Sequence, residues 1–578
     1  MKYPYLSEVT KTREQTNVFG GYHHNLHARD GEFYDMKNLS SSNYPLLSVR
    51  PRRGFVTKTG HGVQGLIGKD VLCWVYDSDF VIGDKKIPLG LSIDEKPKTL
   101  VSMGAYVIIM PDKKYVNTAD TSDFGSLEAS FTTSGTVTFS LCKQDGTGYG
   151  DMAVGDTAPK SPANMALWLD TSDTPHVLKQ YSEASAMWVV IATTYIKISS
   201  TGIGTDFSAG DGITLEGVES DALADLNGTM VLHDKGDDYL VITGILDEMQ
   251  TQETPITVSR RMPNVDFITE SGNRLWGCRY GTDIHGKTVN EIYASKLGDF
   301  KNWNTFMGIS TDSYAASVGT DGAFTGAVTH LGHPIFFKEN CMHKVYGSYP
   351  SNFQIQDTVC RGVQNGCAES LATVNEILYY KSRNAVCAYD GSLPIEISAP
   401  LGDPTYSDAA AGALGNKYYI SMRLSDGRYH FFVYDTARGL WHKEDDTHAS
   451  QFASAGGELY FLAYGKIQSV LGTGTKEEGA LRFMAETGMI GTDSPDRKYI
   501  ARLDIRLSLS VSDEIDFYIE YDSSGKWEHL QTVFGHGTGS FSIPIRPRRC
   551  DHLRLRMEGK GDVKIFSLCK TMEEGSAS

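Results

Sequence analysis

The chain has 578 residues, of which 22% are charged and 40% apolar, and its formal net charge is -17. This length predicts more than one domain, and the composition is typical of globular rather than disordered or membrane proteins. The acidic balance argues against a general nucleic-acid binder, because phosphate contacts need Lys and Arg. No run approaches the roughly 20 apolar residues that span a bilayer, and the start of the chain lacks the apolar segment of a signal peptide, so we expect synthesis in the cytoplasm.

The first segment, residues 1–60, is predicted to be an extended arm. Its part from residue 20 to residue 56 is polar and rich in turns, with a Gly-Gly step and few runs that can form a core. Such a segment does not bury enough apolar surface to offset its own ordering entropy. We therefore expect the arm to be ordered by packing across domains or against neighbouring subunits.

A loose repeat follows the arm, in which a turn precedes an aromatic-rich strand and then a second strand. Gly and Asn in the turns tolerate the positive φ of tight hairpins, as at Gly272-Asn273, Gly332-His333, Gly415-Asn416 and Gly456-Gly457. The seven copies span residues 61–83, 99–117, 265–303, 327–347, 369–391, 410–441 and 449–470. The pattern predicts an all-β protein containing a β-propeller of about seven blades, in two parts at 61–119 and 261–475; a β-sandwich with ordinary hairpins is the alternative.

Residues 120–260 interrupt the repeats and begin with a stretch rich in Ser, Thr and Gly. We predict an inserted small β domain here, with an irregular large blade as the alternative. Trp168, Tyr181 and Trp188 are its candidate ligand-facing aromatics. They would favour a receptor- or glycan-binding protein if they faced solvent in an accessible groove.

Residues 476–578 change character again. Apolar and polar residues alternate with period two from residue 501 to residue 521, and at least two more strands follow. The alternation predicts a half-buried antiparallel sheet, and hence a C-terminal β-sandwich. The last seven residues, MEEGSAS, are expected to form a loose tail.

Two identical basic tetrapeptides are the clearest candidate contact sites. Both read Arg-Pro-Arg-Arg and lie at residues 50–53 and 546–549. Guanidinium groups bind phosphates or carboxylates well, and in an acidic chain we favour salt bridges between subunits or domains over contacts with DNA. The predicted assembly interface consists of Tyr22, His23, Arg50, Arg52, Arg53, Arg546, Arg548 and Arg549.

Catalytic and metal-binding patterns are not found. His23, His24 and His27 cluster without a Cys or a helical spacing to complete a metal site, so a loop is the favoured interpretation. The nine cysteines are scattered in apolar runs, which indicates reduced core thiols. Residues 435–441 and 522–527 only partly match the Asp-box turn of sialidase-type propellers, in which Asp caps a turn and Trp packs beneath it. We expect no enzyme activity and no cofactor.

Three segments carry a resemblance to a known family. The arm reads "D-M-x-N-L" and then "Y-P-x-L-x-x-R-x-x-x-G". Ser295, Gly298, Asp299, Phe300, Asn302 and Trp303 fit "S-x-x-G-D-F-x-N-W", and Phe337, Val345, Tyr346 and Gly347 fit a second blade element. In these segments the chain resembles the β-propeller virion proteins of phage necks and tails, which include the tail nozzle of short-tailed phages.

The resemblance implies a structural virion protein. Copies would form a ring, with six members expected, around the DNA channel of the tail, next to other tail proteins or the portal and adaptor proteins. Double-stranded DNA would be retained and then pass without sequence-specific binding, and the arm would reach a neighbouring copy. Three alternatives stay open: a receptor- or glycan-binding tail protein, a head-to-tail stopper or capsid accessory protein, and a glycan-processing propeller enzyme, which would need two carboxylates at catalytic separation.

Overall fold

The computed structural model describes residues 10–56, 62–93, 97–283, 286–472, 476–493, 496–535 and 537–574. Strands dominate these residues, so the predicted all-β class is confirmed. None of the helices in these ranges has the length and apolarity to cross a membrane. The described helices are four short 3-10 turns, η1 (Asp221–Leu226), η2 (Pro350–Asn352), η3 (Ala368–Ser370) and η4 (Ala399–Leu401).

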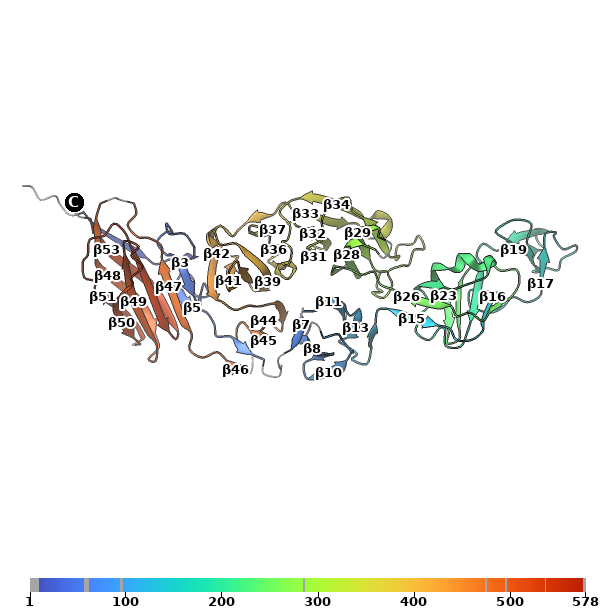
Figure 1. The fold of residues 1–578 in the computed structure, drawn as a ribbon, viewed down its shortest axis with the longest axis horizontal. Helices are drawn as coiled ribbons and strands as arrows, with labels where there is room; N and C mark the ends of the chain where they lie inside the picture. Colours follow the sequence, from blue (N-terminus) through green and yellow to red (C-terminus); the bar gives the residue numbers. More distant parts are fainter. Residues whose placement is uncertain are drawn as a thin grey trace, which may run out of the picture. The chain divides into compact units, whose positions relative to one another are not determined.

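Two compact units make up the chain. The first comprises Met1–Leu100, Phe337–Met342 and Thr358–Ser578, and the second comprises Val101–Phe336 and His343–Asp357. Both units contain antiparallel sheets whose strands pair in chain order (Figure 1). Such an order arises when each strand is joined to the next by a short hairpin.

Four of the seven sequence repeats form sheets of the first unit. Each repeat occupies a sheet of its own, with neighbouring strands antiparallel. The strands are β7 (Val63–Gly68), β8 (Leu72–Tyr76), β9 (Asp79–Ile82) and β10 (Lys85–Pro88); β35 (Ala372–Val374), β36 (Ile377–Lys381), β37 (Val386–Tyr389) and β38 (Ile395–Glu396); β39 (Tyr406–Leu414), β40 (Lys417–Leu424), β41 (Tyr429–Asp435) and β42 (Leu440–Asp445); and β43 (Gln451–Ala455), β44 (Glu458–Ala463) and β45 (Lys466–Ser469).

The other three repeats form four-stranded sheets that have most of their residues in the second unit. Their strands are β11 (Thr99–Met103), β12 (Tyr106–Met110), β13 (Lys114–Asn117) and β14 (Phe124–Ser126); β27 (Phe267–Ser271), β28 (Arg274–Thr282), β29 (Thr288–Ala294) and β30 (Tyr314–Ser317); and β31 (Gly326–His330), β32 (His333–Lys338), β33 (Cys341–Tyr346) and β34 (Gln354–Val359). Each of the seven repeats therefore corresponds to one separate sheet with the strand order of a propeller blade.

Turn chemistry explains the hairpins of these sheets. Gly272 and Asn273 both have positive φ, 61° and 57°, as a two-residue type I′ turn requires. The turn between β31 and β32 lies one residue earlier than predicted, at Leu331 and Gly332, with φ of 49° and 76°. The exposed Leu331 therefore adopts a left-handed backbone conformation, which Gly or Asn would adopt at a lower energetic cost.

The sheets pack face to face around apolar cores. In the first unit, Val63, Leu66 and Trp74 of the β7–β10 sheet pack with Leu462 and Ile467 of the β43–β45 sheet. Packing of this kind buries both faces of a strand in the middle of a sheet. In β36, for example, four of the five residues are buried. Apolar runs such as ILYYK then read as continuous rather than alternating.

The last repeat receives a strand from the arm. β6 (Gly54–Phe55) pairs antiparallel with β45 on one side and with β46 (Lys476–Glu477) on the other. The sheet order is therefore β43-β44-β45-β6-β46. A segment some 400 residues distant along the chain covers an edge of the last sheet, which would otherwise expose unpaired backbone groups.

The insertion forms an eight-stranded sheet in the second unit, with the order β15-β26-β22-β23-β24-β21-β16-β25. Its core is a single cluster of buried residues that includes Phe139, Phe207 and Leu232. The strands are β15 (Ala129–Thr132), β16 (Val137–Cys142), β21 (Tyr195–Ser199), β22 (Gly212–Glu216), β23 (Gly228–Gly236), β24 (Tyr239–Thr243), β25 (Gln250–Gln252) and β26 (Thr257–Arg260).

A smaller sheet of four strands lies on the chain path between β16 and β21. It has the order β17-β18-β19-β20, and β17 and β18 pair in parallel. We call it the small sheet. Its strands are β17 (Met152–Gly155), β18 (Leu167–Asp170), β19 (Val177–Ser182) and β20 (Met187–Val190).

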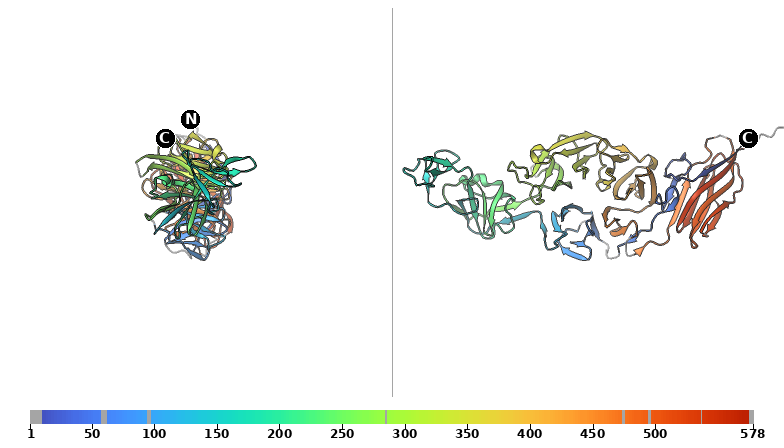
Figure 2. Two further views of the ribbon diagram at one scale, coloured as in Figure 1. Left: turned by 90° about the vertical axis from the view of Figure 1, so that its right-hand side faces the viewer. Right: turned by 180° about the vertical axis from the view of Figure 1, so that it is seen from behind.

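The C-terminal region and the arm together build two six-stranded sheets of the first unit, seen as two layers in Figure 2. One sheet contains β1 (Thr10–Thr16), β4 (Leu39–Ser40), β5 (Leu47–Val49), β48 (Lys498–Leu509), β51 (Gly537–Ile543) and β53 (Val563–Glu574). The other contains β2 (Gly21–Tyr22), β3 (Glu32–Lys37), β47 (Arg482–Thr487), β49 (Glu514–Tyr521), β50 (Glu528–Phe534) and β52 (Leu553–Lys560).

The sandwich corrects the predictions made for the two terminal regions of the chain. The arm is not a separate element, because five of its strands belong to the two sheets of the sandwich and β6 belongs to the last repeat. Residues 572–574, which were predicted to belong to a loose tail, are instead the end of β53, paired with β1 and β48. Residues 575–578 lie outside the described residues.

Candidate assembly site

The first Arg-Pro-Arg-Arg tetrapeptide is the centre of a buried ion cluster. Arg53 donates to Glu444 Oε2 at 2.7 Å and to Asp445 Oδ2 at 2.8 Å, and Arg50 donates to Glu478 Oε2 at 2.7 Å. Arg53 is only 1% exposed, and Arg50 is only 3% exposed. The tetrapeptide connects β5 of the sandwich to β6 of the last repeat, so the cluster lies where the arm passes between two parts of the first unit.

Electrostatics hold this cluster in its charged form. Burial would raise the pKa of the Asp445 carboxyl, but the positive charges of Arg53 and Arg50 outweigh burial and lower that pKa. The pKa of Glu478 is also lowered, because its hydrogen bond and ion pair with Arg50 exceed the effect of burial. Arg53 in addition stacks over the ring of Phe431, with its guanidinium carbon 4.5 Å from the ring centre.

The arm motif that resembles the phage family supports this cluster directly. Asn38 has φ of 55°, a left-handed conformation that Asn tolerates better than most residues. Its side-chain oxygen accepts from Arg50 Nε at 2.8 Å and its amide donates to the Arg482 carbonyl at 2.7 Å. The neighbouring motif residues Met36 and Leu39 are buried. The motif thus fixes the arm within its own chain.

The part of the arm around Gly21 and Tyr22 packs on the β39–β42 sheet. Tyr22 is buried and meets Phe432 edge to face with ring centres 5.4 Å apart. Gly21 has φ of 78°, and a Cβ there would lie 2.4 Å from the Trp441 carbonyl oxygen, so only Gly permits this approach. Beneath it, burial lowers the pKa of His442 to about 3.

The predicted interface residues are therefore of two kinds. Tyr22, Arg50 and Arg53 are buried within the chain, and Arg52 is part-exposed and 3.5 Å from Asp562. These placements match the inter-domain alternative for the first tetrapeptide, and they leave Arg50 and Arg53 no side-chain surface for a neighbouring copy. His23 is half-buried, and its backbone N–H donates to Phe33.

The second tetrapeptide lies on the surface. Arg546, Arg548 and Arg549 are all exposed in the loop that leads into β52. Arg548 pairs with Glu528 at 3.0 Å, and its guanidinium carbon lies 5.0 Å from the ring centre of Tyr521. These three arginines remain the accessible part of the predicted interface.

The second resemblance motif, residues 295–303, anchors the insertion. Asn302 is buried, donates to Asp211 Oδ1 at 2.9 Å and to Asp299 Oδ2 at 2.6 Å, and accepts from the Gly212 N–H at 2.8 Å. Asp211 also pairs with the buried Arg260 at 2.5 Å. The motif residues after β29 are thereby joined to β22 and β26, the base of the inserted sheet.

The three candidate ligand-facing aromatics lie on one face of the small sheet. Tyr181 and Trp188 are opposite each other in the β19–β20 register, and Trp188 is 5.4 Å from both Tyr181 and Trp168 by ring centres. Trp168 is only 7% exposed, and its Nε1 donates to the Gly155 carbonyl at 3.0 Å. The set is a packed cluster rather than an open row of rings, which weakens the glycan-binding interpretation.

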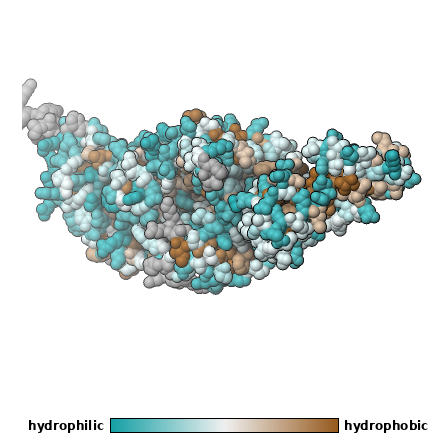
Figure 3. Space-filling view, turned by 45° about the vertical axis from the view of Figure 1, so that its right-hand side comes forward, coloured by the Kyte–Doolittle hydropathy of each residue, from teal (hydrophilic) through white to brown (hydrophobic). Residues whose placement is uncertain are grey.

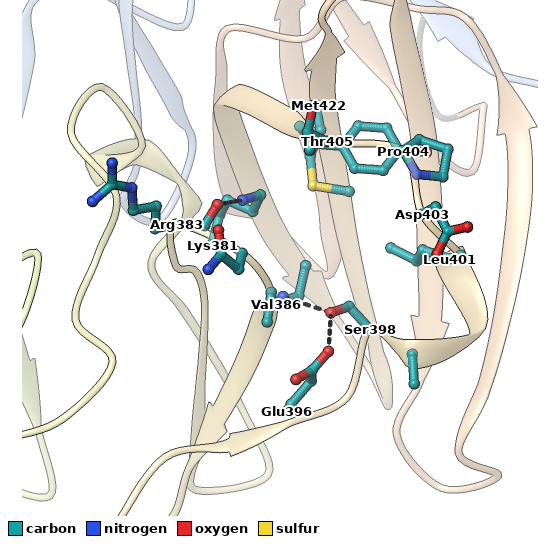
Figure 4. Close-up of a pocket in the computed structure, with 15 residues that line it drawn as sticks. Lys381, Arg383, Val386, Glu396, Ser398, Leu401, Asp403, Pro404, Thr405 and Met422 are labelled. Carbon is teal, nitrogen blue, oxygen red and sulfur yellow. Dashed lines mark hydrogen bonds between the residues drawn. The ribbon is translucent and has the colours of Figure 1, made fainter.

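One cavity of the first unit has a volume of about 260 Å³ and lies beside β36, β37 and η4 (Figure 4). At its wall the buried Lys381 donates to Gln364 Oε1 at 2.8 Å, and burial lowers the pKa of its ammonium group. Arg383, Glu396 and Asp403 give the rim charges of both signs. This balance does not select an anion or a cation, so the cavity supplies no specific chemistry.

Two rows of hydroxyl, imidazole and carboxylate were not anticipated from the sequence. In the sandwich, His552 contacts Ser523 Oγ at 2.7 Å and Asp551 Oδ2 at 2.9 Å, and in the second unit His343 contacts Thr320 and Asp357 at 2.9 and 2.5 Å. The first row lies on an exposed turn where water competes for the carboxylate, and the second has a fully buried imidazole. The first row joins the turn after β49 to the residues before β52, and the second joins the loop at Thr320 to β33 and β34.

Several smaller features concern the histidines, the cysteines and the Asp-box-like turn. Among the described residues, no group of three or more His, Cys, Asp and Glu side chains is placed to hold a metal ion. The Nδ1–H of His24 donates to the Tyr34 carbonyl at 2.9 Å. All nine cysteines are free, and all but Cys360 are buried. Asp435 caps its turn through the Ala437 N–H, and the buried Trp441 packs there, as the Asp-box likeness predicted.

No protein-family profile matches the chain, and no curated protein does either. Among solved structures, U3-55K aligns with 72% of this chain and 99% of its own length, at 7% identity and a TM-score of 0.28. Apo AztD from Citrobacter koseri covers 86% of this chain and 99% of its own, at 8% identity and a TM-score of 0.25. An exo-β-1,3-galactanase from Phanerochaete chrysosporium covers 53% and 95%, at 8% identity and a TM-score of 0.20. Scores this low do not transfer a function.

Proposed function

We propose that this chain is a structural protein of a phage virion, a ring component around the DNA channel of the tail that retains the genome and then lets it pass. The seven repeat sheets close as a seven-bladed β-propeller, with the sandwich and the insertion as additional domains. The ring is expected to hold six copies next to other tail, portal or adaptor proteins.

The observation that carries the proposal is the arm strand β6 in the last repeat sheet. A circular array of sheets has a seam where its two chain ends meet, and a strand supplied from the other end secures that seam. β6 pairs with both β45 and β46, and the buried arginine cluster holds it there. The residues that resemble the phage family, such as Asn38 and Arg50, are the ones that fix this strand.

The charge distribution supports passage rather than tight binding of DNA. The net charge is -17, and the two arginines of the first tetrapeptide that would suit phosphates are paired with carboxylates. A channel that lets DNA slide benefits from a wall that does not hold phosphates. Contacts with neighbouring copies are assigned to exposed groups, among them Arg546, Arg548 and Arg549.

Deletion of the arm cannot test this proposal, because the arm supplies strands to three sheets and its loss would unfold them. The informative experiment is the mass of the purified full-length chain in solution, measured across a concentration series. The proposal predicts a closed assembly near six times 63.5 kDa. A chain that remains monomeric at every concentration contradicts self-assembly into a ring.

A further inference from the structure

The small sheet has two open edges. β17 and β20 are its first and last strands, and within the described residues no strand pairs with the outer side of either. Open edges present rows of unpaired N–H and C=O groups, and they pair readily with another strand.

Both edges are apolar and exposed. Met187, Val189 and Val190 of β20 are 63%, 52% and 53% exposed, and Val154 of β17 is 52% exposed. Neither strand contains a charged residue or Pro, the usual devices that prevent edge-to-edge pairing. Hydrophobic side chains gather at the right-hand end of Figure 3, where this part of the insertion comes forward. Such a surface is typical of an interaction site.

Hydrogen bonds define which backbone groups point outward. The Ile191 N–H donates to the Leu178 carbonyl at 2.8 Å, so in the antiparallel alternation the N–H and C=O of Trp188 and Val190 face away from β19. On the other edge, the Gly155 carbonyl accepts from the Thr171 N–H at 3.2 Å. Its neighbour Val154 therefore presents its backbone groups outward.

We infer that β20 of one copy pairs with β17 of the next copy, so that the small sheets join from subunit to subunit. The inference rests on the proposed ring. β17 runs parallel to β18, and β20 runs antiparallel to β19, so β17 and β20 have the same direction. Copies related by rotation about an axis along the strands would then pair β20 with β17 in parallel, which is a head-to-tail contact that closes into a ring.

A second copy is the occupant that fits both edges. Residues 151–191 carry five acidic residues and two lysines, which disfavours an anionic lipid surface. The two strands themselves are uncharged and expose Met and Val, so each supplies the apolar, β-branched neighbour that the other lacks. A two-fold pairing of β20 with β20 would leave β17 open, whereas the head-to-tail contact covers both edges.

Cross-linking of mixed variants, each with one introduced cysteine, tests this contact. Val154→Cys and Val190→Cys proteins are prepared separately, assembled alone and in mixture, and treated with a short bifunctional maleimide. The head-to-tail contact predicts cross-linked dimers only in the mixture, and a ladder up to the full ring for the double variant. The unmodified protein, and Cys360→Ser versions of each variant, control for the half-buried Cys360.

The outcomes separate this inference from the proposed function. A normal ring mass without cross-links overturns the contact between small sheets and leaves the ring intact. Cross-links in the Val190→Cys protein alone would show a two-fold pairing and would also overturn it. A chain that stays monomeric overturns both the contact and the ring.

A proline variant gives a second, independent readout. Val190→Pro removes only an outward N–H, so pairing of β20 with β19 is retained while pairing with another copy is blocked. The cysteine for cross-linking is introduced as Val189→Cys in the same chain as Val190→Pro. We expect this chain to form at least tenfold less cross-linked dimer with the Val154→Cys protein than a Val189→Cys chain without the proline does. Val511→Lys, at an 89% exposed valine of the sandwich, is the matched control and should leave cross-linking unchanged. Equal cross-linking in both variants contradicts the contact.

Discussion

The same four residues, Arg-Pro-Arg-Arg, occur twice in this chain with opposite structural roles. At residues 50–53 two of the arginines are buried and paired with three carboxylates, whereas at residues 546–549 all three arginines are exposed. The first copy connects two sheets that are distant in sequence, and the second lies in a surface loop. Identical side chains therefore fix the fold in one place and remain available for contacts in the other.

The largest expected effect is at Arg53. Arg53→Ala leaves Glu444 and Asp445 without their closest cation in a buried site, and breaking a buried pair in this way costs about 3–5 kcal/mol. We expect a clear drop in the urea midpoint, measured by tryptophan fluorescence. If the variant unfolds at the same urea concentration as the parent, the cluster does not stabilise the arm.

A change of pH should also affect the buried part of the first unit, at two histidines of the β39–β42 sheet. The pKa values of His442 and His430 are lowered to about 3 and about 4, mainly by burial, so both rings are neutral in the folded chain. As the pH drops below about 6.5, these histidines bind protons in the unfolded chain but not in the folded one. The free energy of unfolding therefore decreases as the pH falls toward the pKa values of the folded state, by up to about 1.4 kcal/mol per pH unit for each histidine.

The measurement is the unfolding midpoint between pH 7 and pH 4. His442→Leu should flatten the slope, because the variant has no proton to bind at that position in either state. A parent protein whose stability does not change over this range would contradict the buried, neutral state of these rings.

A smaller effect is expected at Asn38, which orients Arg50. Asn38→Ala removes hydrogen bonds to Arg50 and to the Arg482 carbonyl and places Ala at φ of 55°, a loss of about 1–3 kcal/mol. Asn38→Gly keeps the left-handed backbone and should recover part of the loss. Thermal unfolding of the two variants separates the contribution of the side chain from that of the backbone.

The smallest effect on stability is expected in the second tetrapeptide. Arg549→Ala changes an exposed side chain and should shift the free energy of unfolding by no more than about 0.5 kcal/mol. Its mass in solution is measured in parallel, because an exposed arginine that contacts a neighbour reveals itself in assembly rather than in folding. A large loss of stability would remove the difference between the two tetrapeptides.

The sequence predicts the local parts of this structure better than the distant ones. Each of the seven repeats lies in its own sheet, because Gly and Asn turns and aromatic strands are local signals. The pairing of β1 with β53 joins residues more than 550 positions apart, and no local pattern reports it. The burial of Arg53 likewise depends on its ion pairs with Glu444 and Asp445, which are distant in the sequence. The tetrapeptide alone therefore did not predict that Arg53 is buried.

The candidate contact surfaces show the same limit. Trp168, Tyr181 and Trp188 were identified by residue type, and register placed them together on one face, where they cover one another. The open edges β17 and β20 were missed, although the uncharged runs MAVG and MWVV are visible in the sequence. Whether an apolar run is a core strand or an exposed edge is decided by which other strands flank it.

The most direct test of the virion assignment is an image of phage particles labelled with a gold-conjugated antibody against this chain. The account predicts label on the tail, in a number that fits a single ring. Label on the capsid shell away from the tail, or particles that carry no label, would contradict it.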